Sequence, residues 1–169
     1  MAATVTGKAQ LPGTAAEVAA AVLEGIQTYP TAFDMNTWVG LRDIGHFEPE
    51  HAPACGTTMC AAGWVAHVTG WTLVDALYEN DETDEPILIT YSDGVTCFEF
   101  RHVYASKDGI NRPITDVARE ALSLTNDETF WYDDARTALI RLHQIAERDQ
   151  DDREPDMHAG TGHGAYEYR

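Results

Sequence analysis

The spacing of apolar residues changes along the chain, and this change most constrains the fold. Near both ends, apolar residues recur every three or four positions, as on one face of a helix. Between residues 86 and 102 they alternate instead, on both sides of Asp93-Gly94. This arrangement is typical of a β-hairpin. The sequence therefore predicts an α+β chain that is mainly helical and carries one inserted antiparallel β-hairpin, with strands at about 86–91 and 95–102.

Capping residues and prolines set the expected helix boundaries. Thr14 with Glu17 predicts a capping box, and Pro30 ends the helix that follows. Thr125 with Glu128 predicts a second capping box before a short helix that includes residues 130 and 131. The other expected helices cover about residues 57–70, 72–79, 114–122 and 134–148.

The remaining segments carry signals of loops or extended chain. Residues 33–39 are rich in aromatic and β-branched side chains, which favours a short strand or an extended segment. Residues 40–56 contain several glycines and prolines and predict an ordered loop. A loop is also expected around Lys107-Asp108-Gly109. We expect one globular domain over residues 1–148, with the hairpin insertion at about 80–112, and an acidic, flexible tail over 149–169.

The net charge of the chain limits the kinds of molecule that it is expected to bind. The chain of 169 residues has 28 acidic and 11 basic residues, a formal net charge of -17. This charge repels phosphate backbones, so we expect no direct binding to nucleic acid and favour a basic protein partner. Five acids within seven residues form the candidate partner-binding surface: Glu79, Asp81, Glu82, Asp84 and Glu85. A solvated loop is the structural alternative for this run.

The cysteines and the lack of a long apolar run indicate the compartment. Three cysteines, an odd number, argue against a disulfide framework and favour a reducing environment. No apolar run approaches the roughly 18 residues of a membrane span, and the first 15 residues do not resemble a signal peptide. We therefore expect a cytoplasmic protein without a membrane partner.

The segment Cys55–Trp64 is the most distinctive in the sequence. A structural interpretation explains it fully: Gly56 allows a tight turn, a threonine caps a helix, and the small residues up to Gly63 let another backbone approach. A metal site is an alternative, with His51, Cys55 and Cys60 as ligands and His46 and His67 nearby. The ligand spacing is irregular for zinc, and we expect no cofactor.

A second alternative makes Cys60 a nucleophile. The first turn of a helix lowers the pKa of a thiol and supplies backbone donors to an oxyanion. The general base would be His67, His102 or His143, although His67 lies two turns along the same helix. The four tryptophans at positions 38, 64, 71 and 131 predict core packing, with room for one of them to be partly exposed in a binding groove.

Three motifs together resemble a family of small uncharacterised proteins encoded by actinobacteriophages and by scattered bacterial genomes. They are F-D-M-x-x-W at 33–38, C-G-T-x-x-C-x-A-G-W at 55–64 and L-x-L-T-x-x-E at 122–128. The resemblance covers about residues 16–79 and 114–146 and implies a phage or actinobacterial source and an intracellular place of action. Residues 80–112 and the tail are additions to the family pattern.

Two functions from different classes follow. The leading hypothesis is a non-enzymatic acidic interaction protein, encoded by a phage, that binds a basic host protein as an inhibitor or a DNA mimic. The alternative is a metal-binding or cysteine-dependent enzyme centred on Cys55 and Cys60. A site of the second kind requires an open, polar pocket at Cys60, whereas a scaffold role requires that the thiol be buried.

Overall fold

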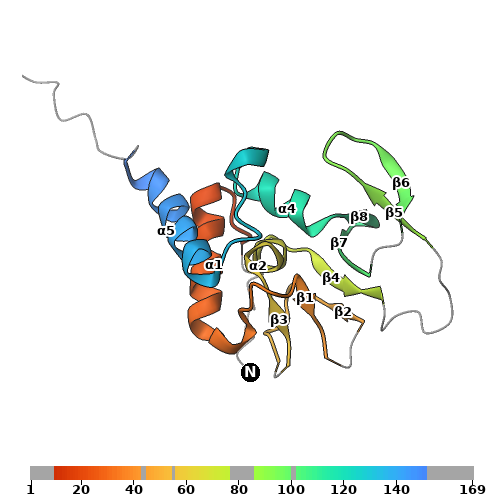
Figure 1. Cartoon of the computed structure of the whole chain (residues 1–169), viewed down its shortest axis with the longest axis horizontal. Helices are drawn as coiled ribbons and strands as arrows, with labels where there is room; N and C mark the ends of the chain where they lie inside the picture. Colours follow the sequence, from red (N-terminus) through yellow and green to blue (C-terminus); the bar gives the residue numbers. More distant parts are fainter. Residues whose placement is uncertain (1–9, 43–44, 55, 77–85, 100–101, 152–169) are drawn as a thin grey trace, which may run out of the picture.

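The computed structural model describes residues 10–42, 45–54, 56–76, 86–99 and 102–151 (Figure 1). Within these ranges, four α-helices and eight β-strands form a mixed α+β fold. The strands belong to three antiparallel sheets. The expectation of a mainly helical chain with a single hairpin is therefore wrong.

Helices α1 (Ala15–Thr28) and α5 (Ala135–Asp151) pack side by side at one end of the molecule (Figure 1). The predicted capping box starts α1: the Thr14 hydroxyl accepts a hydrogen bond from the Glu17 N–H, and the Glu17 carboxylate accepts one from the Thr14 N–H. The predicted final helix is confirmed as α5. The apolar side chains that both helices bury in the core include Val18, Val22, Ile26, Ala138, Leu142 and Ile145.

Helix α2 (Ala61–Val68) lies in the centre of the fold, and all but its last residue are buried. It begins later than the sequence predicts, because Thr58–Met59 forms strand β3 and pairs with strand β1 (Val39–Gly40). A short 3-10 helix, η1 (Pro30–Ala32), connects α1 to the segment that leads into β1. The main chain of Thr58 and Met59 is thus paired in a sheet, and the helix starts after it.

A four-stranded sheet covers α2, in the order β2 (His46–Phe47), β4 (Thr72–Asp75), β7 (Val103–Lys107) and β8 (Ile110–Arg112). The predicted helix over residues 72–79 is wrong over its described part, where β4 lies. Leu73 and Val74 are both buried, on opposite faces of this strand. A short apolar run buried on both faces cannot be told from a helix by its spacing, and pairing with β2 and β7 decides the outcome.

A hairpin joins β7 to β8 where the sequence analysis expects a loop. Asp108 and Gly109 form its turn with φ angles of 52° and 78°. Two consecutive residues with positive φ are the mark of a type I′ turn, which matches the twist of the strands on either side. The residues around 107–109 therefore belong to the central sheet.

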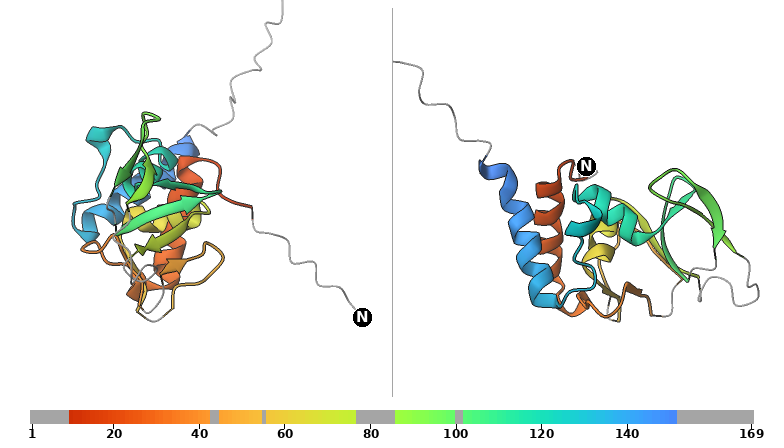
Figure 2. Two further views of the ribbon diagram at one scale, coloured as in Figure 1. Left: turned by 90° about the vertical axis from the view of Figure 1, so that its right-hand side faces the viewer. Right: turned by 45° about the horizontal axis from the view of Figure 1, so that its top comes forward.

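The predicted hairpin is confirmed as β5 (Ile87–Thr90) and β6 (Thr96–Glu99), with Gly94 at φ 82° in the turn. It lies at the end of the molecule away from the helix pair (Figure 2). Ile89 is fully buried against Val74 and Tyr104, on the face of the central sheet opposite α2. The sheet is thus covered by the main core on one face and by this hairpin on the other.

The last part of the fold connects the sheet back to the helix pair. Helix α4 (Ile114–Ala121) is confirmed where the sequence predicts it and packs on α2. The second capping box is also present, but it opens only a 3-10 turn, η2 (Asn126–Glu128), so the predicted short helix does not reach residues 130 and 131. Within the described ranges, no helix combines the length and apolar character of a membrane span.

Candidate functional site

The small residues of the Cys55–Trp64 motif bring α2 against its neighbours. A Cβ atom added to Gly63 would lie 2.6 Å from the Trp38 carbonyl oxygen, and the same oxygen accepts a hydrogen bond from the Cys60 N–H at 3.4 Å. The indole of Trp64 occupies the space beside Gly25 of α1 and donates to the Ala32 carbonyl at 3.3 Å. These contacts match the close approach that the structural interpretation expects of the small residues. The expected threonine cap is wrong, because Cys60 is the N-cap of α2 and no side chain among the described residues caps the helix.

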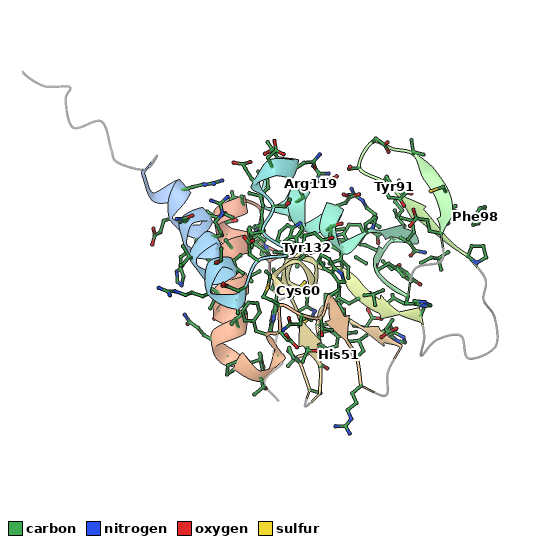
Figure 3. The ribbon with its side chains drawn as sticks, in the orientation of Figure 1. His51, Cys60, Tyr91, Phe98, Arg119 and Tyr132 are labelled. Carbon is green, nitrogen blue, oxygen red and sulfur yellow. The ribbon has the colours of Figure 1, made fainter. Side chains whose placement is uncertain are left out.

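Cys60 lies at the start of α2 and is 1% exposed. Burial raises the pKa of its thiol, although main-chain N–H groups of the first turn, from Gly63 and Ala62, act in the opposite direction. Figure 3 shows Cys60 near the middle of the molecule. A neutral thiol that solvent does not reach is a poor nucleophile.

The candidate bases lie in different environments. His67 is 7% exposed and stacks on Phe47, with 4.6 Å between ring centroids and 18° between ring planes. Burial lowers its pKa from 6.5 to about 4. His102 and His143 are exposed, on the approach to β7 and on α5 respectively.

The metal candidates do not form a site among the described residues. No group of three His, Cys, Asp or Glu side chains there could hold a metal ion. His46 and His51 are exposed, whereas Cys60 is buried. Cys55 lies outside the described residues, as does the whole proposed partner-binding run of Glu79, Asp81, Glu82, Asp84 and Glu85.

The β5–β6 hairpin presents an apolar pair to solvent. Leu88 and Phe98 face each other across the strands and are 48% and 70% exposed. Thr90 and Thr96 form the next pair on the same face, with their hydroxyl oxygens 3.0 Å apart. We call these four residues the hairpin outer face. Phe98 lies at the end of the molecule farthest from α5 (Figure 3).

A second exposed feature is a cavity of about 250 Å³ beside α4, which we call the Trp38–Tyr132 pocket. The Trp38 and Tyr132 rings lie 5.5 Å apart at 87° to one another. The other residues that line the pocket are Val103, Ile114 and Thr115. The position of Trp38 follows from the contact of its main chain with Cys60 and Gly63 at the start of α2.

Tyr132 is held outward by the residues on either side of it. Phe130 and Trp131 are buried and anchor the chain in the core, and the Asp133 N–H closes a turn onto the Phe130 carbonyl at 3.2 Å. Asp134 then caps α5 by accepting a hydrogen bond from the Thr137 N–H at 2.8 Å. Between these fixed points Tyr132 is 86% exposed.

Sequence reasoning did not identify either exposed feature as a site. Residues 87–89 are all apolar, so the sequence does not indicate which face of β5 is exposed. Tyr132 follows two aromatic residues that are both buried, so its exposure could not be predicted from its neighbours. Two tryptophans, Trp38 and Trp71, are partly buried where the sequence analysis expects one at most, and Trp38 lines the pocket. No sequence signal distinguished these two from Trp64 and Trp131, which are buried.

The exposed groups described above are apolar and aromatic side chains, and the Cys60 thiol is buried. A comparison of the chain with protein-family models, with curated proteins and with solved structures finds no match.

Proposed function

We propose that this protein is a non-enzymatic binding protein that docks a basic protein partner on the hairpin outer face. The observation that carries the proposal is the exposed cross-strand pair of Leu88 and Phe98. Adjacent exposed apolar side chains lose contact with water when a partner covers them, and aromatic anchors of this kind dominate many interfaces. A solitary exposed apolar residue would carry no such argument.

Charge supports a basic partner. The net charge of -17 would attract a positively charged protein and speed its association at low salt. The acidic run of residues 79–85 directly precedes β5 in the sequence, which places five negative charges within a few residues of the hairpin along the chain. In the phage setting that the family resemblance implies, the partner is a host protein.

The apolar pair favours one form of this function over another. A DNA mimic acts through carboxylates that imitate phosphates, whereas Leu88 and Phe98 suit an inhibitor or adaptor that packs against apolar groups of its target. The burial and raised pKa of Cys60 do not support the alternative of a cysteine-dependent enzyme.

The test compares variants that change this surface with a matched change elsewhere. Leu88→Thr combined with Phe98→Thr removes the apolar pair and keeps residues that suit strands. Ile140→Thr is the control, since Ile140 is 46% exposed on α5. Unchanged melting temperatures of the double variant would show that the hairpin still folds.

Each protein is used as bait in host lysate, and captured proteins are quantified by mass spectrometry and then purified for affinity measurements. We expect the double variant to bind its purified partner at least about 30-fold more weakly than the wild type, as removal of a hot spot worth about 2 kcal/mol predicts. Ile140→Thr is expected to bind as the wild type does. Equal affinity of the double variant and the control would contradict the proposal.

A further inference from the structure

The two rings of the Trp38–Tyr132 pocket form a corner. Because the ring planes lie at 87° to one another and both rings line the cavity, a group placed in the corner lies against both aromatic side chains. Aromatic faces carry a negative electrostatic potential and attract cations within about 6 Å of the ring centroid. The 86% exposure of Tyr132 keeps this corner open to a ligand from solution.

The acidic composition of the chain segment that carries Tyr132 favours a cation. The chain from Asn126 to Asp134, which carries Tyr132, has four acidic residues and no basic one. Hydrogen bonds to Thr125 and Thr137 lower the pKa of Glu128 and Asp134, so these carboxylates are ionised at neutral pH. Among the described residues, the side chains that line the pocket are neither basic nor acidic.

Arginine on the neighbouring helix does not reverse this balance. Arg119 lies next to Asp116 at 3.6 Å in an ion pair on α4, and Asp116 directly follows Thr115 of the pocket. This pair contributes one charge of each sign. On α5, Arg141 and Arg148 act on Glu128 and Arg136 acts on Asp134, so these arginines offset part of the charge of the Tyr132 loop. The preference for a cation therefore also depends on the net charge of -17 of the whole chain.

The rest of the lining suits the stem of a lysine. Val103 and Ile114 are apolar and can pack against methylene groups, and the Thr115 hydroxyl can accept a hydrogen bond. The same molecule already places one ammonium group over an aromatic ring, since the Lys107 ammonium lies 5.8 Å from the centre of the Trp71 ring.

We propose that the Trp38–Tyr132 pocket binds a lysine side chain, with the ammonium group in the corner that the two rings form and the methylene stem against Val103 and Ile114. The identity of the lysine as part of a basic protein partner rests on the proposed function. Binding of the isolated side chain does not, because it requires only this pocket.

The experiment is a titration followed by residue-resolved NMR of the full chain. The probes are Nα-acetyl-lysine amide and Nα-acetyl-norleucine amide, which differ in the ammonium group. We expect the lysine probe to shift the Trp38 indole N–H signal in a saturable way, while the Trp71 signal, whose ring already faces Lys107, stays in place. The norleucine probe is expected to cause no saturable shift.

Two variants identify the ring that makes the site. Tyr132→Leu is expected to weaken binding of the lysine probe about fivefold or more, while Tyr132→Phe keeps it, because phenylalanine retains the aromatic face. Both changes lie at an exposed side chain, so we expect the fold to stay intact.

Either of two results would overturn the proposal: shifts of Trp38 of equal size with norleucine and lysine probes, or equal lysine binding by wild type and Tyr132→Leu. Neither result bears on the hairpin outer face, which the Leu88 and Phe98 variants test. If those variants lose partner binding but still bind the lysine probe normally, the hairpin outer face and the Trp38–Tyr132 pocket act independently.

Discussion

We expect acid to destabilise this protein through one buried side chain, His67. Its imidazole stacks on Phe47 and lies near the Trp64 ring, and its Nδ1 atom has no hydrogen-bond partner within the described structure. Burial lowers the pKa of His67 from 6.5 to about 4, against the opposing effects of a hydrogen bond to the His51 main chain and the charge of Glu50. The folded protein therefore keeps this side chain neutral over a range in which the unfolded chain protonates it.

The sign and size of the effect follow from linkage. Between pH 6.5 and about 4 the unfolded state binds more protons at His67, so the free energy of unfolding falls as the pH falls through this range and levels off below it. The pKa difference of about 2.5 corresponds to about 3 kcal/mol in total. The part expected between pH 7.5 and 5.5 is about 1.3 kcal/mol.

Urea unfolding followed by tryptophan fluorescence at pH 7.5, 6.5 and 5.5 measures how the free energy of unfolding depends on pH. His67→Gln removes the titration while keeping a side-chain N–H donor, and His143→Gln is the control because His143 is exposed on α5. Taking the difference between wild type and variant cancels the other titrating groups. The stability of wild type relative to His67→Gln is expected to fall by about 1.3 kcal/mol from pH 7.5 to 5.5. A difference that stays constant with pH would refute the reasoning.

Three further predictions concern the motif helix and the acidic run. Gly63→Leu would place a Cβ atom 2.6 Å from the Trp38 carbonyl oxygen, so we expect it to cost about 1–3 kcal/mol in urea unfolding or to prevent folding, unlike Ala135→Leu at an exposed position. A melting temperature within a degree or two of wild type would contradict this. Elemental analysis is expected to find no stoichiometric zinc, and about one zinc per chain that is lost in Cys55→Ser would refute that expectation. Replacing four acids of the run with serine is expected to slow partner association at low salt and leave dissociation unchanged; wild-type association rates would show that these charges do not steer binding. The four acids are Asp81, Glu82, Asp84 and Glu85.

Local rules predicted the elements that local chemistry determines. The two capping boxes form because each needs only residues three positions apart, and the Asp93-Gly94 turn forms because glycine accepts a positive φ. The Asp108-Gly109 turn obeys the same rule. Its Asp-Gly pair is the same hairpin signal as at Asp93-Gly94, although we expected only a loop there. Strand β4 is different, since its pairing partners come from residues far away in the chain.

The candidate sites depend on tertiary structure and were therefore not predictable in the same way. Leu88 is exposed while Ile87 and Ile89 face the sheet, a distinction that requires knowing which face of the hairpin packs on Val74 and Tyr104. Trp38 and Tyr132 are distant in sequence and meet because α2 fixes one and the turn before α5 fixes the other. Only the general expectation of an acidic binding surface followed from composition.

We propose that the hairpin outer face carries recognition and that the Cys60 motif supports the fold. The most direct measurement compares binding of the purified partner to immobilised wild type, the Leu88→Thr/Phe98→Thr variant and Cys60→Ala, each checked for folding by circular dichroism. We predict that the hairpin variant binds at least about 30-fold more weakly and that folded Cys60→Ala binds as wild type does. Undiminished binding by the hairpin variant, together with loss of binding in folded Cys60→Ala, would contradict the account.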